Sequence, residues 1–414
     1  MRDAYDVVVL GGGPGGTAAA VAAAKRGASV LLVERYGFLG GMATAGLVLP
    51  FMHYYSGDKP LTTAVFNELI DRLDKAGGLA KNRHTFDDEI MKVVLDRMMA
   101  DHGVEVALHH LFTGAEHANG VISTVHLEGK SVRKTVGAKV FVDSTGDGDL
   151  AAAAGAEIQV GRPQDGACQP MTLNFRLGGV EGTPANDPDA WKLGKELTEI
   201  YLAAKKRGEV TNPREDVLIF TTMAPGVVHF NTTRVVGKSG VDADALGAAE
   251  VEGRRQVMEM LTLLKKHSPR FKNAFLLKMG CQIGIRESRR VMGAYVLTQD
   301  DVLQARKFED GIARSNYPVD IHNPAGTGTV IKNVPKDDWY EVPYRCIVPN
   351  RVRNLLVGSR CISATHEAHS SMRVMPVVAC IGEAAGAAAA QCAKKGIEPS
   401  KVDGKALKKE ILGE

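Results

Sequence analysis

The chain has few cysteines, and no two of them are paired in the sequence. Its 414 residues include six cysteines, which are scattered without a C-x-x-C spacing. That scatter argues against a structural zinc site, an iron–sulfur cluster or a redox disulfide between neighbouring thiols. We therefore expect no bound metal, and reduced thiols of the kind found in the cytoplasm.

The chain also lacks an excess of charge and a convincing membrane segment. Its formal net charge is only +3, which gives no reason to expect nucleic acid or a membrane as a partner. The most apolar window, residues 374–393, is rich in small residues and contains Glu383, so we expect a buried helix there. A predicted strand begins within a few residues of Met1, which leaves no room for a signal peptide. Both features predict a cytoplasmic protein.

Glycine and alanine are abundant near the start, in "YDVVVLGGGPGGTAAAVAAAKRGASVLLVE". The run "DVVVL" predicts a buried parallel strand, residues 17–26 a helix, and "SVLLVE" a second strand. Gly11, Gly13 and Gly16 form a G-x-G-x-x-G pattern, which allows a tight turn, close approach of a pyrophosphate, and packing of helix on strand. Glu34 ends the second strand, where it can accept hydrogen bonds from a ribose. The stretch predicts dinucleotide binding.

Three features favour FAD over NAD as that dinucleotide. The glycine-rich loop "RYGFLGGMATAG" follows Glu34, where a plain NAD domain would continue to its next helix. Only one full G-x-G-x-x-G pattern exists in the chain. The distant segment "NLLVGSR…SSMRVMPVVACIGEAAGAAAA" predicts a strand, a loop and a helix that return to the cofactor. The helix N-terminus near Met375 and Val377 would then face the flavin C2 carbonyl and stabilise negative charge on reduced flavin.

The pattern of elements predicts an α/β fold, with a Rossmann-type FAD-binding domain and an inserted mixed-sheet α+β substrate domain. The alternation of strands and helices at the start resumes near residue 340, after a middle section of strands and long polar helices. We therefore assign residues 1–169 and 338–414 to one discontinuous FAD-binding domain. Residues 170–337 are assigned to the substrate domain.

Several long motifs resemble those of a known family. They include "GGMATAG", "DSTGDGDLAAAAGAE", "NTTR", "GIRESRR", "YPVDIH" and "NLLVGSRCISATHEAHSSMRVM", which together span nearly the whole chain. The chain resembles the FAD-dependent oxidoreductase family of the glutathione-reductase-like superfamily, in its subgroup without a second NAD-binding domain. The resemblance implies a redox reaction through flavin N5. Disulfide chemistry is not expected, because "FLGGMATA" stands where disulfide reductases have a cysteine pair.

The glycine pattern and the resemblance together define the residues expected at the cofactor. The resemblance adds the loop after Glu34, the "STGDGD" turn and the C-terminal return. The expected residues are Gly11, Gly13, Pro14, Gly15, Gly16, Glu34, Arg35, Gly40, Gly41, Met42, Ala43, Thr145, Gly146, Asp147, Gly358, Arg360, Met375 and Val377.

Candidates for catalysis lie in "GIRESRR" and "ATHEAHSSMR". If the first motif is a strand, Arg286, Ser288 and Arg290 share one face, where a guanidinium can clamp a carboxylate. An arginine–glutamate network that braces the two domains explains the motif equally well. His366 is the candidate general acid or base, with a structural hydrogen bond as the alternative. Arg373 is a further catalytic candidate, and Asn231, Arg234 and His322 are polar residues of second rank.

The sequence therefore predicts a FAD-dependent dehydrogenase or reductase. It would transfer a hydride between flavin N5 and a small polar substrate, such as a carboxylate, and exchange electrons with an acceptor or donor that the sequence does not identify. The alternatives are a flavoprotein that uses FAD without net redox turnover, and an NAD-dependent dehydrogenase. Whether the chain forms a homo-oligomer stays open at this point.

Overall fold

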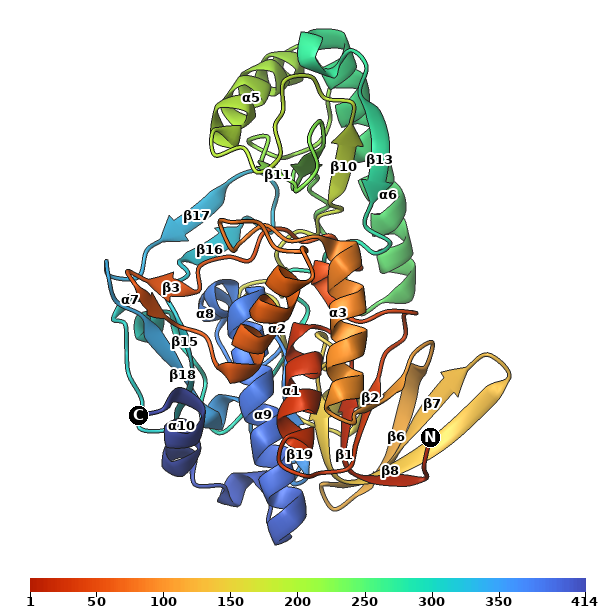
Figure 1. Ribbon diagram of the computed structural model, residues 1–414, viewed down its shortest axis with the longest axis vertical. Helices are drawn as coiled ribbons and strands as arrows, with labels where there is room; N and C mark the ends of the chain where they lie inside the picture. The colour runs from red at the N-terminus through yellow and green to blue at the C-terminus, as the bar shows by residue number, and fades with distance from the viewer.

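The computed structural model describes residues 1–414 and is built around a seven-stranded sheet in the order β5-β2-β1-β8-β7-β6, with β19 paired to β8 (Figure 1). Four strands run parallel around β1, while β7 and β6 are antiparallel to their neighbours. The predicted α/β, Rossmann-type fold is confirmed. The strands are β1 (Ala4–Leu10), β2 (Val30–Val33), β5 (Glu105–Ala107), β6 (Leu111–Ala118), β7 (Val121–Gly129), β8 (Val132–Asp143) and β19 (Leu355–Val357).

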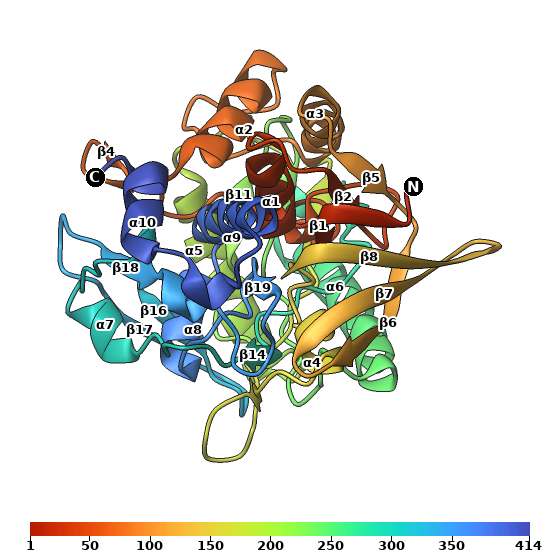
Figure 2. The ribbon, with the colours of Figure 1, turned by 90° about the horizontal axis from the view of Figure 1, so that it is seen from below.

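Strand β8 serves two different parts of the sheet. Its first half pairs with β7, and that hairpin with β6 projects away from the body of the protein (Figure 2). Its second half pairs with β1 on one side and with β19 on the other, both in parallel. The C-terminal ends of β1, β8 and β19 therefore meet at one edge of the sheet, where α/β proteins bind their ligands.

Helix α9 (Met375–Lys395) is the central helix of the larger domain and packs along α1 (Pro14–Ala24). The two backbones approach closely because α9 carries glycine at the contact: a Cβ on Gly386 would lie 2.0 Å from the carbonyl oxygen of Ala19. Helix α9 is long and apolar enough to span a bilayer, but 94% of its most apolar window is buried inside the protein. The expectation of a buried helix at residues 374–393 is confirmed.

The remaining helices of the larger domain cover the sheet or close its edges. Helices α2 and α3 pack against each other beside α1, and α10 packs against α9. They are α2 (Ala64–Lys75), α3 (Asp88–Asp101), α4 (Asp149–Ala153), α7 (Gln299–Leu303), α8 (His366–Met372) and α10 (Gly404–Leu412). The smaller antiparallel pairs are β3 (Tyr55–Ser56) with β4 (Lys59–Pro60), β9 (Ile158–Val160) with β14 (Arg289–Val291), β15 (Gly311–Ser315) with β18 (Tyr340–Pro343), and β16 (Val319–His322) with β17 (Thr329–Lys332).

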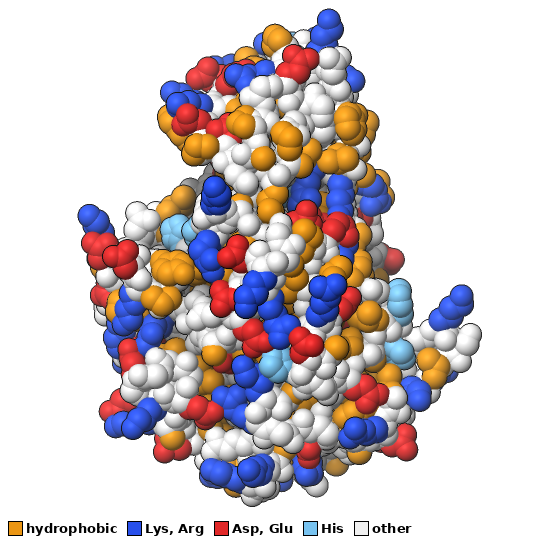
Figure 3. All heavy atoms as spheres, in the orientation of Figure 1, with side chains coloured by type: hydrophobic (Ala, Val, Ile, Leu, Met, Phe, Trp, Pro, Cys, Tyr) orange, Lys and Arg blue, Asp and Glu red, His pale blue; other side chains and the backbone are white.

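A second hydrophobic core forms the smaller domain, at the top of Figure 1. Its antiparallel sheet has the order β11-β12-β10-β13 and is covered by two long helices. The elements are β10 (Phe175–Gly178), α5 (Ala190–Lys206), β11 (Ile219–Thr221), β12 (Val228–Phe230), α6 (Ala243–His267) and β13 (Phe275–Met279). On the face shown in Figure 3, positive and negative side chains are interspersed over both domains.

The expected substrate domain, residues 170–337, is divided between the two cores. The buried residues of the second core run from Met171 to Ile285, whereas Val291, Ile312 and Val319 belong to the first core. The reason is strand pairing, because β14 pairs with β9 and β15 pairs with β18 of the larger domain. The inserted unit therefore ends near residue 285 and not at residue 337.

The strand expected through "GIRESRR" is wrong for most of its length. Only residues 289–291 form a strand, and residues 285–288 have no regular structure. Alternation does not apply there, so Arg286, Ser288 and Arg290 point to different neighbours. The sequence patterns also gave no indication of β6.

We predict that Gly386→Ala destabilises the protein by about 1–3 kcal/mol, because the new methyl group would press on the backbone of α1. Urea denaturation measures the change in the free energy of unfolding. The matched control is Gly247→Ala in α6, where a Cβ would meet nothing within 4 Å, so that a gain of about 0.5–1 kcal/mol is expected. Equal effects of the two substitutions would contradict the close α1–α9 contact.

Candidate active site

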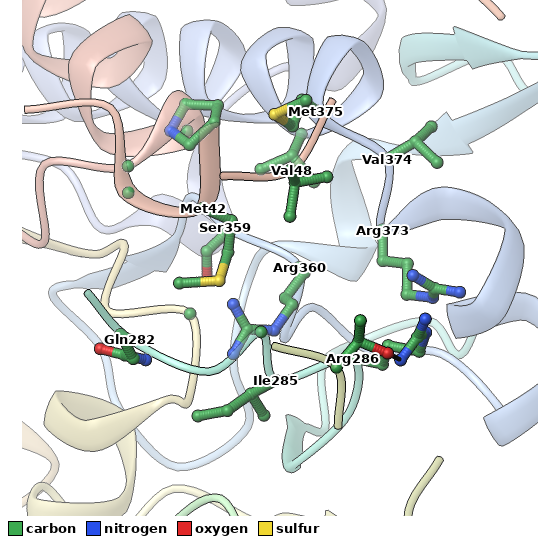
Figure 4. A pocket seen from close by; sticks show the side chains of 18 of the residues that line it. Met42, Val48, Gln282, Ile285, Arg286, Ser359, Arg360, Arg373, Val374 and Met375 are labelled. Atoms are coloured by element: carbon green, nitrogen blue, oxygen red, sulfur yellow. Dashed lines mark hydrogen bonds between the residues drawn. The ribbon is translucent and has the colours of Figure 1, made fainter. Parts of the chain in front are cut away.

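One cavity of about 530 Å³ runs from the C-terminal edge of the sheet to the smaller domain. Figure 4 shows some of the side chains that line it. Its first part is lined by the glycine turn after β1, the end of β2, the 145–149 turn and the start of α9. Its second part is lined by residues of β16, β17 and the smaller domain. A long cofactor and a substrate can therefore share one continuous space.

The glycine turn leaves a backbone cradle on the cavity side. Gly11 has φ 96°, and a Cβ there would lie 2.4 Å from the carbonyl oxygen of Ser144. A Cβ on Gly16 would meet the carbonyl oxygen of Gly11 at 1.7 Å, so strand and helix need glycine at both positions. Gly13 differs, because its Cβ would meet only the Cα of Gly41, at 3.9 Å. A side chain at Gly13 would thus project into open space of the cradle.

Two helix N-termini face this part of the cavity. Helix α1 starts with Gly13 as N-cap and Pro14, and helix α9 starts with Val374 as N-cap and Met375. Neither N-cap has a side-chain hydrogen bond, and neither first turn contains an acidic residue. Their free N–H groups and helix dipoles therefore favour negative charge, such as a pyrophosphate or an electron-rich ring carbonyl.

Glu34 is held rigidly at the end of β2. One of its carboxylate oxygens accepts a hydrogen bond from the N–H of Gly12 at 2.7 Å, and the other from the N–H of Tyr36 at 3.0 Å. Burial raises the pKa of Glu34, although these backbone hydrogen bonds oppose the shift. The carboxylate lines the cavity, and its remaining lone pairs are placed to accept hydrogen bonds from ribose hydroxyls.

The fully buried carboxylate of Asp143 holds the 145–149 turn in place through hydrogen bonds. Asp143 accepts hydrogen bonds from the N–H and hydroxyl of Thr145 and from the N–H of Ala151, and burial raises its pKa to about 6. Above it, Asp147 binds Arg360 at 2.7 Å. The buried Nε of Arg360 has no partner within the chain, and Figure 4 shows this side chain in the middle of the cavity. An unpaired donor there fits a polar ligand.

At the far end of the cavity, Arg286 and Arg373 point to the same corner (Figure 4). Arg286 donates to the carbonyl of Pro170 at 2.8 Å, to the hydroxyl of Thr172 at 2.5 Å and to the amide oxygen of Asn231 at 3.4 Å. All three acceptors are neutral, so the positive charge of Arg286 has no carboxylate partner. Burial and the charge of Arg373 lower the pKa of Arg286, a cost that a bound anion would relieve.

Asp320 organises the polar groups next to the two arginines. Its carboxylate accepts a hydrogen bond from Tyr317 at 2.9 Å and lies 3.6 Å from Nε2 of His322 and 3.7 Å from Arg373. Burial alone would raise the pKa of Asp320, but these partners outweigh it and hold the pKa well below the usual range. Arg373 therefore shares its charge with Asp320, and Arg286 carries the net positive charge of this corner.

His322 is held as one tautomer at the cavity wall. Its Nδ1 lies 3.1 Å from Nη2 of Arg234, which can only donate, so Nδ1 must accept. The Thr329 hydroxyl is also near Nδ1, but it donates to Glu215 at 2.6 Å. Burial and the charge of Arg286 lower the pKa of His322 to about 3, so the ring is neutral at pH 7. Its proton therefore sits on Nε2, toward Asp320.

His366 lies outside this constellation. It is buried on α8, and its Nδ1 is 2.9 Å from the carboxylate of Glu287, which also pairs with Arg290. The three side chains form a closed network that ties α8 to residues 287–290, and His366 does not line the cavity. This placement contradicts direct contact with a substrate and favours the structural alternative. The nearby His369 is buried as well and does not line the cavity.

Most of the residues expected at the cofactor do line the cavity. They are Gly11, Gly13, Pro14, Gly15, Glu34, Arg35, Gly41, Met42, Thr145, Gly146, Asp147, Arg360 and Met375. The remaining ones do not line the cavity: Gly16, Gly40, Ala43, Gly358 and Val377.

Sequence reasoning missed several lining residues. Tyr317 and Asp320 belong to "YPVDIH", a motif whose individual roles the sequence did not indicate, and hydrogen bonds of this segment to α8 place them beside Arg373. Gln282 accepts a hydrogen bond from Arg35 and joins the two parts of the cavity. No local pattern around it signals that contact, because its partner is 247 residues away.

Comparison with known proteins agrees with this geometry. Residues 6–411 match the family model described as FAD dependent oxidoreductase. The chain belongs to this family. None of the curated proteins matches the chain significantly. The chain is thus a FAD-dependent enzyme, and FAD is the cofactor of its family.

Solved structures similar to this family member share its fold. A geranylgeranyl bacteriochlorophyll reductase-like protein from Thermoplasma acidophilum has a TM-score of 0.50 and 15% identity, over 95% of this chain and 79% of that one. A flavin-dependent brominase has a TM-score of 0.50 and 14% identity, over 98% of this chain and 81% of that one. At such low identity the likeness concerns the fold and not the substrate.

The residues present fit FAD. The pyrophosphate has an open cradle at Gly13 and the N-terminus of α1, and the ribose has Glu34. The ring system has the start of α9 and the unpaired Nε of Arg360. The apolar side chains of Met42, Val48 and Met375 line the same region (Figure 4).

We predict that Gly13→Ala yields a folded protein that binds FAD at least about tenfold more weakly, because the methyl group fills the cradle without touching protein atoms. Fluorescence titration of the apoprotein with FAD measures the affinity, and circular dichroism checks that the fold is intact. Full flavin content in the purified variant would show that the phosphate lies elsewhere.

Proposed function

We propose that this enzyme is a dehydrogenase or reductase that transfers a hydride between flavin N5 and a small molecule bearing a carboxylate. The observation that carries the proposal is the uncompensated charge of Arg286 in a cavity continuous with the dinucleotide cradle. A guanidinium is suited to bind a carboxylate through two parallel hydrogen bonds. The free protein supplies only neutral acceptors to it, so a carboxylate is the missing partner.

The corner has the groups that such a substrate needs. Arg286 would bind the carboxylate, and Arg373, which keeps an unpaired buried Nε, would bind a second oxygen. Bound FAD would supply hydride transfer at N5. Neutral His322 would keep its proton on Nε2, since Arg234 fixes the tautomer, and would use this N–H to donate a hydrogen bond to an oxygen of the substrate on which negative charge develops.

We further propose that the enzyme belongs to the glutathione-reductase-like branch that lacks a second NAD-binding domain. The single G-x-G-x-x-G pattern supports this assignment, and so does the antiparallel sheet of the smaller domain, which offers no second cradle of the same kind. Electrons would then be exchanged with a donor or acceptor outside the chain.

We predict that Arg286→Ala weakens the binding of carboxylate ligands by about 2–3 kcal/mol, because a charge-assisted hydrogen-bonded pair is lost. The measurement compares a carboxylate with its neutral amide analogue in the FAD-loaded protein. Arg286→Lys keeps the charge and should recover part of the affinity. Equal losses for the acid and the amide would point to a purely structural role of Arg286.

We predict that His322→Asn slows flavin reduction by substrate about 10²–10³-fold, the usual cost of removing one hydrogen-bond donor to charge that develops in the transition state. Asparagine can still accept the hydrogen bond from Arg234, so FAD should stay bound. Because the pKa of His322 is lowered to about 3, its neutral form persists at all higher pH values, and the rate should not titrate through this group between pH 5 and 8.

His366→Asn serves as the comparison for that experiment. It leaves the cavity intact but removes a partner of buried Glu287, so unfolding should become easier while the rate of flavin reduction stays close to that of the unmodified protein. Stopped-flow reduction under anaerobic conditions, together with thermal unfolding, separates the two effects. If the His366→Asn variant reduces flavin slowly but unfolds at the same temperature as the unmodified protein, His366 acts in catalysis and not in the scaffold.

A further inference from the structure

We propose that the substrate is amphipathic, with an apolar chain or ring that extends from its carboxylate to the outer end of the cavity. There the side chains of Leu218, Phe220 and Ile331 line the wall. The inference rests on the proposed function, because the carboxylate at Arg286 sets the position and direction of the rest of the molecule.

Strand alternation directs apolar side chains of β11 to the cavity. Phe220 of β11 and Leu218, which directly precedes the strand, line it and are half-buried, whereas Ile219, between them, is buried in the core of the smaller domain. Successive side chains of a strand point to opposite faces, so one face of β11 completes the core and the other forms a wall of the cavity. More than one apolar side chain on the same side of this segment therefore lines the cavity.

The same alternation occurs on β17, which belongs to the other domain. Thr329 and Ile331 line the cavity, and Val330 and Lys332 do not. Thr329 lies beside His322 at the polar corner, and Ile331, two residues further, is 60% exposed at the cavity mouth. The start of β17 reaches the segment that precedes β11, because the N–H of Gly328 and the hydroxyl of Thr329 donate hydrogen bonds to Glu215. Polar and apolar subsites therefore follow each other along one strand.

The charged side chains at this end already have partners within the chain. Arg214 pairs with Asp216 at 2.7 Å, and Arg234 pairs with Glu215 at 2.8 Å. In this part of the cavity the uncompensated charge is thus confined to the corner around Arg286, while the outer end combines balanced charges with apolar surface. A ligand with one anionic end and an apolar body matches this distribution, and a small dicarboxylate does not.

The test is calorimetric titration of the FAD-loaded protein with acetate, butyrate, hexanoate and octanoate. The proposal expects the affinity to rise by about two- to fourfold for each methylene group that becomes buried. The rise should be accompanied by a progressively more negative heat-capacity change of binding. The corresponding alcohols, which lack the carboxylate, should bind more weakly at every length.

Two single substitutions localise the effect. Ile331→Ser should flatten the dependence on chain length while leaving the affinity for acetate unchanged. Val330→Ser is the matched control, because it changes the neighbouring apolar and exposed residue of the same strand, whose side chain does not line the cavity. That control should keep the full dependence on chain length.

The outcomes separate this inference from the proposal on which it rests. If acids of all lengths bind equally, and Arg286→Ala abolishes their binding, the carboxylate site stands and the apolar subsite is refuted. Equal effects of Ile331→Ser and Val330→Ser would also refute it. If Arg286→Ala leaves the binding of every acid unchanged, the proposed function itself fails.

Discussion

The structure depends on one constraint, the approach of four backbone segments to within van der Waals contact around the first glycine turn. The turn touches the end of β8 through Gly11 and Ser144, the end of β19 through Gly15 and Gly358, and α9 through Gly382. A Cβ on Gly11, Gly15 or Gly382 would overlap a backbone oxygen, and a Cβ on Gly358 would overlap neighbouring side chains, so the contacts have little room for adjustment. The cofactor cradle is the remaining open side of this junction, which explains why glycines that never meet the cofactor are as necessary as those that do.

A second junction determines where the substrate corner lies. Glu287 is fully enclosed by Arg290, His366 and the N–H of Gln169, while its neighbour Ser288 binds Asp147 of the cofactor side. These contacts fix an irregular segment at the base of the smaller domain. Arg286, one residue before Glu287, is consequently held at the cavity with little freedom to move. A buried ion pair such as that of Glu287 with Arg290 adds little net stability. Its effect here is to hold the neighbouring Arg286 in position.

The sequence was sufficient for the parts of the molecule that local patterns encode. The apolar run of β1, the glycine spacing and Glu34 at the end of β2 predicted the fold and the cradle, because each rests on contacts within a short stretch of chain. The corner around Arg286 was not predictable in the same way. Its geometry comes from irregular backbone at 285–288 and from hydrogen bonds that join Tyr317 and Asp320 to α8, and neither has a periodic pattern. His366 was a catalytic candidate because histidine is suited to proton transfer. Its burial beside Glu287, which only the structure shows, favours a structural role.

The pairing of α1 with α9 has a consequence for the order in which the protein can assemble. The N-terminal helix is complete when the first residues have left the ribosome, but its partner is separated from it by more than 300 residues. During synthesis the apolar side of α1 must therefore stay shielded by something other than its final neighbour, because exposed apolar surface of a partly made chain invites association. Strand β19 is synthesised equally late. The edge of β8 that pairs with β19 therefore stays unpaired until then. Because the start of α9 also lines the cofactor cavity, the complete FAD site can form only after that helix has been synthesised.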